Sequence, residues 1–489
     1  MARDRIIYMI AKGIEAVVGI VTMSCMTHFF TASQMGQYTV VNIAITFFGM
    51  VAIQWLAQAV LRYVNKYDTT ERKEEFYGTV LSTWLRINLL SVAILAIAGV
   101  VLGIAGTKGI AIANTKIPAM EVIFWGCMWF FTYNTTLIIT SMLAALREAT
   151  LNLYISVISV VGRLLFIVLL TRILGNIVEI IFISYFLVDA IICVIGFKKL
   201  HFLKYILMRK MSKDILKELG EYGMPLMGNM VTNSILNKSD AYIITGYVGS
   251  AATGIYQTNY SIVATAFTML SSSIMRGSYP TILKVWSEGR KEEAISLISD
   301  SVRTYLLLAV PAVVGVTSVS DVLAASLFDK EYFSGNDIMF WVALGMMILG
   351  LTEYSIKPWE LNAKTKNILR CSLIGGLANL GLNLIFVPIW GYKVAAVTTF
   401  IGFAVYFIAV KIGTRKYQSW KLRKRTYVNL LLSVAVMYIA IVFIKQYLPY
   451  NIFTLAFLVM LGVVVYGVTL LITGEVKEEA KAILRRLKK

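Results

Sequence analysis

Apolar runs long enough to cross a lipid bilayer dominate the pattern of this sequence. A spanning helix needs about 20 predominantly apolar residues, and fourteen stretches of the chain reach that length. Their approximate limits are 6–29, 38–64, 77–104, 119–146, 150–171, 178–197, 222–247, 254–275, 301–326, 336–361, 368–388, 393–413, 427–447 and 452–473. The pattern predicts an all-α polytopic membrane protein with fourteen transmembrane helices.

Composition strengthens this prediction and excludes several classes of protein. Of the 489 residues, 58% are hydrophobic and only 15% are charged, whereas about a quarter of the residues in soluble proteins are charged. A cytosolic enzyme, a DNA-binding protein and a secreted disulfide scaffold are therefore excluded. The four cysteines and two histidines show no spacing typical of metal ligands. We therefore expect no metal, no cofactor and no catalytic residues.

Basic residues lie mainly on one side of the predicted helices. With the N-terminus in the cytoplasm, about 35 of the 46 Lys and Arg residues fall in cytoplasmic segments, as the positive-inside rule requires. We therefore expect both termini in the cytoplasm, and the net charge of +19 does not indicate a nucleic-acid partner. Three basic, amphipathic segments, 198–217, 411–425 and 475–489, are typical of contact with an anionic lipid bilayer.

The two halves of the chain show an internal repeat. Matching residues recur at offsets of 216 to 218: Gly36 with Gly254, Tyr38 with Tyr256, Arg86 with Arg303, and Gly175 with Gly391. Because each half has six helices, both halves lie the same way up, as the parallel repeats of transporters do, with the site between them. We predict an N-lobe (1–197), a cytoplasmic amphipathic linker (198–221), a C-lobe (222–413) and helices 13 and 14 with a basic tail (414–489).

Ionisable residues inside the predicted spans are the candidate functional residues, because such residues are costly in a membrane and usually pair or face a watery cavity. The basic set is Lys12, Arg86, Arg163, Lys238 and Arg303. The acidic set, with a coupling or structural role, is Glu15, Asp189, Asp240 and Glu353. Arg62 and Arg276, at the cytoplasmic ends of two spans, are predicted to line a cytoplasmic entrance.

Two interpretations of these charges stay open. In the first they form structural salt bridges, with Arg86 and Asp189 at equal depth and Lys12 and Glu15 on one helix face. In the second the basic residues face a cavity and bind an anion. Arg suits phosphate because its planar fork donates two parallel hydrogen bonds, and Lys acts as a point charge.

Several motifs make the chain resemble the MOP exporter superfamily, and within it the Wzx-type polysaccharide-unit flippases. They are AKGIEAVVGIV (11–21), MGQY (35–38), LRYVNKY (61–67), LNKSDAYIITGYVGSAATGIYQTNYSI (236–262), YPTILK (279–284) and GGLANLGLNLIFVPIWGYKVAAVTTFIG (375–402). The resemblance covers essentially the whole chain. It implies a V-shaped bundle of two lobes, like that of the multidrug (MATE) exporters, that opens alternately to each side of the membrane.

The resemblance also implies a function. Similar proteins flip undecaprenyl-pyrophosphate-linked oligosaccharide repeat units from the inner to the outer leaflet of the bacterial cell membrane for capsule, O-antigen or exopolysaccharide synthesis. The expected partners are the glycan lipid, a polysaccharide polymerase and glycosyltransferases, and we expect a monomer. Transport coupled to the membrane potential or to H⁺ or Na⁺ is a hypothesis.

Three alternatives compete with this function. A lipid II flippase of peptidoglycan synthesis also has fourteen helices, but it typically has several arginines in helices 1 and 2, where this chain offers Lys12 and Arg62. A cation-coupled multidrug exporter uses buried carboxylates, and Asp189, Asp240 and Glu353 keep it open. A membrane polymerase usually needs an exposed outer loop with paired carboxylates or an Arg/His cluster, and the short predicted outer loops offer neither.

Overall fold

A computed structural model of the chain describes residues 2–107, 120–146, 148–208, 210–362, 364–417 and 420–477. Within these ranges it does not describe the side chains of 2–12, 102–107, 120, 149, 228–229, 232–233 and 235–237. This part of the chain is all-helical and contains no strand. Eleven of its helices are long and apolar enough to cross a membrane, so the protein is a polytopic membrane protein. Helices also occupy the other predicted places, but α9 (Lys213–Tyr247) and α10 (Ser250–Ser287) are too polar to qualify and the described apolar part of α1 (Ala2–Phe29) is shorter. The count of fourteen spans therefore stays a prediction.

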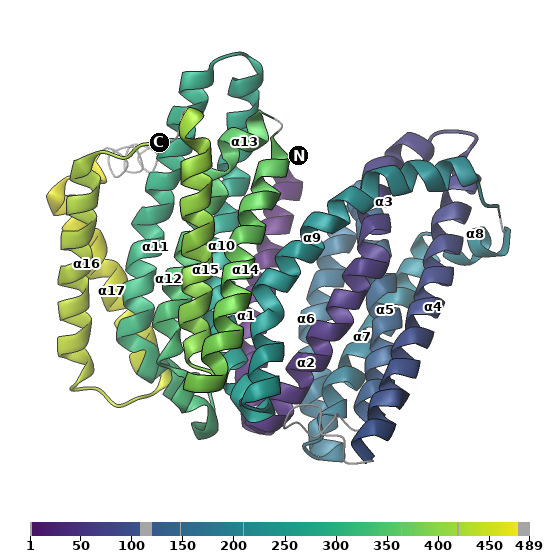
Figure 1. Ribbon diagram of the computed structural model, residues 1–489, viewed down its shortest axis with the longest axis horizontal. Coiled ribbons are helices and arrows are strands. Elements are labelled where there is room, and N and C mark those ends of the chain that lie inside the picture. The colour runs from purple at the N-terminus through teal and green to yellow at the C-terminus, as the bar shows by residue number, and fades with distance from the viewer. Residues whose placement is uncertain are drawn as a thin grey trace. The chain divides into compact units, whose positions relative to one another are not determined.

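The chain divides into two compact units, Met1–Gly254 and Ile255–Lys489. The first contains α1 to α9 and the first residues of α10 (Figure 1). Its further elements are α2 (Ala32–Gly49), the π-helical turn η1 (Met50–Gln54), α3 (Trp55–Tyr67), α4 (Lys73–Thr107), α5 (Met120–Ala145), α6 (Ala149–Leu174), α7 (Glu179–Lys199) and α8 (Phe202–Met208). Its core lies where α3, α4 and α5 pack together, around the fully buried Leu56, Phe76 and Leu143.

The second unit contains the rest of α10 and the helices that follow it. These are α11 (Lys291–Leu327), η2 (Lys330–Gly335), α12 (Ile338–Ser355), α13 (Lys357–Leu361), α14 (Thr365–Trp390), α15 (Val394–Gly413), η3 (Thr414–Lys416), α16 (Lys424–Lys445) and α17 (Ile452–Thr473). Tyr305 and Tyr354 are fully buried between α11 and α12. The last two helices, yellow-green to yellow in Figure 1, pack against each other and against α11. The predicted limits of the lobes stay a prediction.

Polar caps explain where two helices begin. Thr31 forms a capping box with Gln34 at the start of α2, which satisfies two backbone N–H groups that the helix itself leaves free. Ser212 accepts a hydrogen bond from the backbone N–H of Ile215 and so starts α9 at Lys213, inside the stretch predicted as a linker. Residues 213–221 of the predicted linker are therefore helical and continuous with α9, and their role as a linker stays a prediction.

The helix starts reproduce the repeat seen in the sequence. The first residues of α2 and α10, of α4 and α11, and of α5 and α12 are each 218 positions apart. Gly175 and Gly391 end the corresponding helices α6 and α14 with φ of 86° and 75°, a conformation that favours glycine. Corresponding parts of the two units therefore share their local geometry.

Candidate functional site

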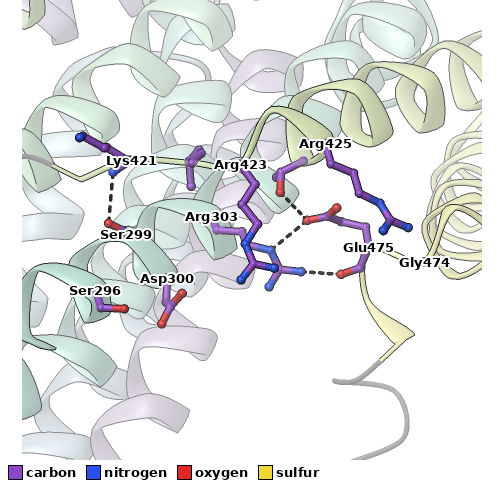
Figure 2. A pocket seen from close by; sticks show the side chains of 11 residues that line it. Ser296, Ser299, Asp300, Arg303, Lys421, Arg423, Arg425, Gly474 and Glu475 are labelled. Atoms are coloured by element: carbon purple, nitrogen blue, oxygen red, sulfur yellow. Dashed lines mark hydrogen bonds and ion pairs between the residues drawn. The ribbon is translucent and has the colours of Figure 1, made fainter.

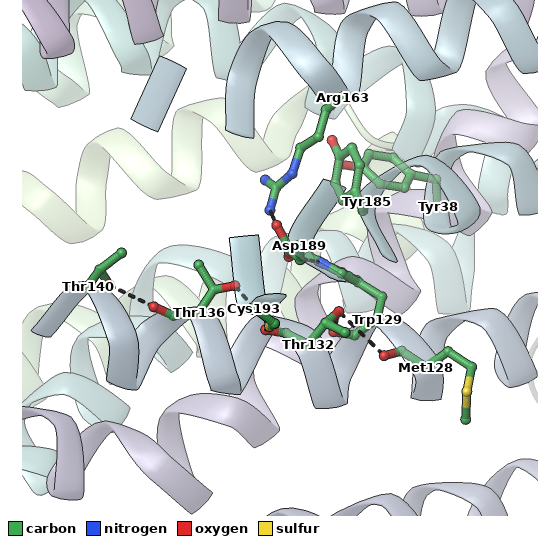
Figure 3. A network of polar contacts seen from close by, with 10 residues as sticks. All are labelled: Tyr38, Met128, Trp129, Thr132, Thr136, Thr140, Arg163, Tyr185, Asp189 and Cys193. Atoms are coloured by element: carbon green, nitrogen blue, oxygen red, sulfur yellow. Dashed lines mark hydrogen bonds and ion pairs between the residues drawn. The ribbon is translucent and has the colours of Figure 1, made fainter. Parts of the chain in front are cut away.

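A fully buried carboxylate organises the polar interior of the first unit. Asp189 on α7 has no solvent exposure, and both of its oxygens accept hydrogen bonds from Nη2 of Arg163 on α6, at 2.8 and 3.0 Å (Figure 3). The indole N–H of Trp129 on α5 donates a further hydrogen bond of 3.0 Å to Asp189. Three helices are thus joined at one side chain, which compensates the cost of burying its charge.

Aromatic rings surround the other side of Arg163. Its guanidinium lies 4.5 Å from the ring centre of Tyr185, and the hydroxyl of Tyr185 lies 3.0 Å from that of Tyr38 on α2 (Figure 3). Nε of Arg163 is buried and has no hydrogen-bond partner among the described residues. Cation–π contact with Tyr185 stabilises the guanidinium there. The Arg163 charge is therefore neutralised by Asp189 and held by aromatic packing.

This arrangement corrects the predicted pairing of Arg86 with Asp189. Arg86 lies on α4, which does not contribute to the network around Asp189, and its side chain is exposed. Its Nη1 lies 3.6 Å from the sulfur of Met211, and no carboxylate of the described part of the chain pairs with it. Equal depth in two helices did not imply contact, because the Asp189 carboxylate faces Arg163 on α6 and Trp129 on α5, and Arg86 contacts Met211.

Two further cations of the first unit lack a carboxylate partner among the residues described. Lys238 is exposed on α9, and the nearby Asp240 is 4% exposed and turned inward, as expected for residues two positions apart. The guanidinium of Arg62 on α3 lies 4.5 Å from the ring centre of Tyr222 on α9. Together with Arg86, these cations give the first unit positive charges that are available to an anion.

The side chain of Lys12 lies outside the described residues, so the predicted pair with Glu15 stays a prediction. Glu15 lies on α1 and is half-buried.

In the second unit, Arg276 on α10 is exposed and forms no ion pair with a described residue.

Arg303 of the second unit contacts the chain that follows the last helix. Its Nε lies 2.9 Å from Oε1 of Glu475, whose side chain is 6% exposed (Figure 2). Thr426 and Asn429 on α16 also donate hydrogen bonds to the Glu475 carboxylate, at 2.8 and 3.0 Å. Burial opposes ionisation of Glu475, but these hydrogen bonds and the Arg303 charge outweigh it and hold its pKa below the ordinary value. Arg86 and Arg303 match in the repeat, yet only Arg303 has a carboxylate partner in the described structure.

Carboxylates and amides form two further polar groups in the second unit. Glu353 on α12 is an exposed residue, and its carboxylate accepts a hydrogen bond of 2.8 Å from Ser271 on α10. Asn379 on α14 donates to Thr399 on α15 at 3.0 Å and accepts from Asn383 at 2.6 Å. No group of three His, Cys, Asp or Glu residues with metal-binding geometry occurs in the described segments.

Sequence reasoning missed Trp129 and Glu475 as parts of these sites. A tryptophan in an apolar span gives no signal that its N–H has a buried carboxylate partner. Glu475 opens a segment that the sequence predicts to be a basic tail. The one available signal was its position directly after Gly474, which ends α17 with φ of 80° and so turns the chain back toward the protein.

Comparison with known proteins places the chain in a family. Residues 1–286 match the model of a family described as polysaccharide biosynthesis protein. An uncharacterized membrane protein of Methanocaldococcus jannaschii, MJ1068, is 22% identical over 53% of this chain and 51% of its own length. The probable low-salt glycan biosynthesis flippase Agl15 of Haloferax volcanii is 30% identical over 34% of this chain and 35% of its own. The matches thus span about half and about a third of these curated relatives.

Two solved structures show the same fold. A lipid II flippase, MurJ, in an inward closed conformation matches with a TM-score of 0.73, 16% identity and full coverage of both chains. An inward-facing multidrug resistance transporter of the MATE family, within the MOP superfamily, matches with a TM-score of 0.58 and 14% identity over 84% of this chain and 93% of that one. These likenesses show the fold alone. Since the family model covers more than half of its length, the chain belongs to the polysaccharide biosynthesis protein family and has the fold of the MOP superfamily.

Proposed function

We propose that this protein is a transporter that flips lipid-linked oligosaccharides across a membrane, from the cytoplasmic to the outer leaflet, by alternating access. The observation that carries the proposal is membership of the polysaccharide biosynthesis protein family. The similarity to a probable glycan biosynthesis flippase of Haloferax volcanii supports it. The carrier lipid is proposed to be undecaprenyl pyrophosphate, the membrane the bacterial cell membrane, and the product a surface polysaccharide.

The chemistry of the first unit supports an anionic substrate. Arg62, Arg86 and Lys238 carry positive charge, and none of them has a carboxylate partner in the described part of the chain. Arg86 lies roughly 20 Å along α4 from Lys73, at 1.5 Å per residue. A cation at membrane depth usually faces water or a partner rather than lipid. We propose that Arg86 and Lys238 contact the pyrophosphate and that Arg62 attracts it from the cytoplasm.

The polar pair Arg163–Asp189 has a different proposed role. Because the pair is neutral overall, it offers little attraction to pyrophosphate. We propose that it fixes α6 against α7 and positions Tyr185 and Tyr38, whose rings and hydroxyls suit contact with sugar. Arg303 is likewise proposed to be structural, since its charge is balanced by Glu475.

A flipping assay in liposomes tests the function. The purified full chain is reconstituted with a fluorescent undecaprenyl-pyrophosphate-linked oligosaccharide, and a membrane-impermeant quencher reports the fraction in the outer leaflet over time. We expect quenching to reach completion with protein and to stop at about half without it. Equal rates with and without protein would rule out the proposed function.

Charge-removing variants test the proposed site in the same assay. A charge-assisted hydrogen bond contributes about 1.5–3 kcal/mol, so Arg86→Gln and Lys238→Gln should each slow flipping about tenfold or more. Arg172→Gln is the matched control, because Arg172 is exposed in the last turn of α6, away from the proposed site. If the wild-type protein flips the lipid and both Arg86→Gln and Lys238→Gln flip it at the wild-type rate, the proposed site is wrong while the proposed function still holds. Unlabelled lipid II that competes as well as the oligosaccharide lipid would favour the lipid II alternative.

A further inference from the structure

A basic pocket in the second unit is separate from the proposed transport residues. It has a volume of about 520 Å³ and lies where α11, the segment before α16, the start of α16 and the end of α17 meet (Figure 2). Four cationic side chains line it: Arg303, Lys421, Arg423 and Arg425. The lining contains two carboxylates, Asp300 and Glu475. The pocket therefore carries a net positive charge.

The pairing inside the pocket leaves most of this charge available. Glu475 is engaged by Arg303 at 2.9 Å. Arg425 donates a hydrogen bond of 3.0 Å to the backbone oxygen of Thr473, which leaves its charge uncompensated. Lys421 and Arg423 form no ion pair with any residue that the structure describes. Three cations thus remain around a hollow large enough for a phosphate group.

The start of α16 adds to the positive potential. Arg423 is the N-cap residue of this helix, and its side chain makes no capping hydrogen bond. The first backbone N–H groups of a helix lack partners within the helix, and together with the helix dipole they favour an anion. Leu422, Arg423 and Arg425, which line the pocket, stand at this end of the helix.

The position of the pocket points to a membrane ligand. It lies at the ends of two candidate spans, Lys424–Lys445 and Ile452–Thr473, where lipid headgroups meet a membrane protein. Next to it, Val428 on α16 and Ile472 on α17 are 63% and 74% exposed, as expected for side chains that face lipid tails. A lipid lying along these helices would place its phosphate beside Arg423 and Arg425.

We propose that this pocket binds a phosphate group, in the form of the headgroup of an anionic membrane lipid. The lipid is a bound component and not the transported substrate, so the inference goes beyond the proposed function. Lys421, Arg423 and Arg425 hold the phosphate, and Arg303 with Glu475 forms the floor of the site. A free phosphate from the cytoplasm has the same chemistry and is distinguished by the experiment.

Binding is measured on the purified full chain in detergent. Native mass spectrometry follows the titration of phosphatidylglycerol, and calorimetry follows inorganic phosphate. We expect the variant Arg423→Gln/Arg425→Gln to weaken phosphatidylglycerol binding about tenfold or more, because it removes two charge-assisted contacts. Asp300→Asn should strengthen binding about threefold, because it removes an exposed negative charge from the pocket.

A double variant elsewhere on the same unit is the matched control. Lys366 and Arg370 are exposed in the first turns of α14, and Lys366→Gln/Arg370→Gln removes the same charge. Unchanged binding in this control, with the loss in the pocket variant, supports the lipid site. An equal loss in both variants would overturn it, and so would wild-type affinity of the pocket variant. Tight binding of inorganic phosphate, lost in the pocket variant, would support the phosphate pocket and assign its source to the cytoplasm. A thermal unfolding curve confirms that each variant is folded.

Discussion

Asp189 carries a negative charge into the interior of a membrane protein, and its three partners explain how the fold accommodates it. Arg163 supplies the opposite charge, Trp129 supplies a further hydrogen bond, and Tyr185 covers the guanidinium. A buried ion pair adds little net stability compared with a well-packed apolar pair, but breaking it by removing one partner is strongly destabilising. The main role of the pair is therefore to hold α6 and α7 in a fixed position relative to each other.

Removal of one member of this pair should destabilise the protein. Asp189→Asn leaves the Arg163 charge without a counter-ion, so we expect a loss of about 3–5 kcal/mol in the free energy of unfolding. The double variant Arg163→Met/Asp189→Leu should recover most of it. Thermal unfolding in detergent measures both. The exposed pair Lys393–Asp337 is the control, and Asp337→Asn should cost less than about 1 kcal/mol. Equal stability of Asp189→Asn and the wild type would contradict the structural role.

Glu475 gives a second prediction, on the dependence of stability on pH. Its pKa is lower in the folded chain than in the unfolded one, so its contribution is present above the ordinary Glu pKa of about 4.3 and is lost as the pH falls through the lowered pKa. Glu475→Gln should lower stability by about 1–2 kcal/mol at neutral pH. The difference from the wild type should shrink below about pH 4.

Melting temperatures from pH 7 to pH 3 check this prediction. Glu293→Gln removes an exposed carboxylate that pairs with Arg290 and serves as the control, with little change at any pH. A difference between Glu475→Gln and the wild type that stays constant across this range would mean that the carboxylate is not the stabilising form.

The partners of individual charges were the part of the site that the sequence could not predict. The types and depths of the residues follow from the apolar pattern, and Arg163, Asp189 and Arg303 all lie within helices as expected. Pairing depends on the rotation of each helix about its axis, and this rotation is fixed by packing against several neighbours at once. Arg163 thus pairs with Asp189, 26 positions away in the sequence, while Arg86, predicted at the same depth as Asp189, does not.

At the scale of helices, the repeated glycines Gly36 and Gly254 lie where the backbones of two helices come into close contact. A Cβ atom on Gly36 would lie 1.8 Å from the backbone oxygen of Ser250, and one on Gly254 would lie 1.9 Å from that of Ala32. The hydroxyls of Ser33 and Ser250 lie 2.9 Å apart beside them. The matching glycines thus let the starts of α2 and α10 approach until their backbones touch, and both positions need a residue without a side chain.

The substitution Gly36→Ala should therefore destabilise the protein, although alanine has the higher helix propensity. Alanine favours a helix over glycine by about 1 kcal/mol, but the contact with Ser250 requires the backbone to move. We expect Gly36→Ala to lower the melting temperature. Gly467→Ala in α17 is the matched control, since a Cβ there would meet open space, and it should leave stability unchanged or raise it. Thermal unfolding compares the two variants, and a rise for both would show that the close approach is not needed.

Helix positions were predictable, and helix lengths were not. The predicted span 452–473 coincides with α17, whereas the predicted span 254–275 lies within the much longer α10. Hydropathy reports where a helix lies in the membrane, but caps and packing decide where it ends. The polar start of α9, for example, is helical because the Ser212 side chain caps it outside the apolar stretch.

At the scale of the whole molecule, charge links the fold to the proposed transport. The chain carries a net charge of +19, and its predicted asymmetry across the membrane sets orientation. Ion pairs neutralise Arg163 and Arg303, so the cations proposed to contact the substrate are Arg62, Arg86 and Lys238, all in the first unit. The proposed pyrophosphate-linked substrate would bring its own negative charge, so that the membrane potential could supply energy for transport without a bound ion.

The magnitude of this energy leads to the final prediction. Moving one charge through 100 mV changes the free energy by about 2.3 kcal/mol, so two negative charges leaving a negative interior gain about 4–5 kcal/mol. In liposomes with an imposed potassium diffusion potential, flipping of the pyrophosphate-linked oligosaccharide toward the outside should accelerate when the interior is negative and slow when it is positive. A neutral, phosphate-free lipid analogue carried by the same protein is the control and should show no such dependence. If both potentials give the same rate for the charged lipid, the potential does not drive transport, and coupling to H⁺ or Na⁺ becomes the hypothesis to test with ion gradients.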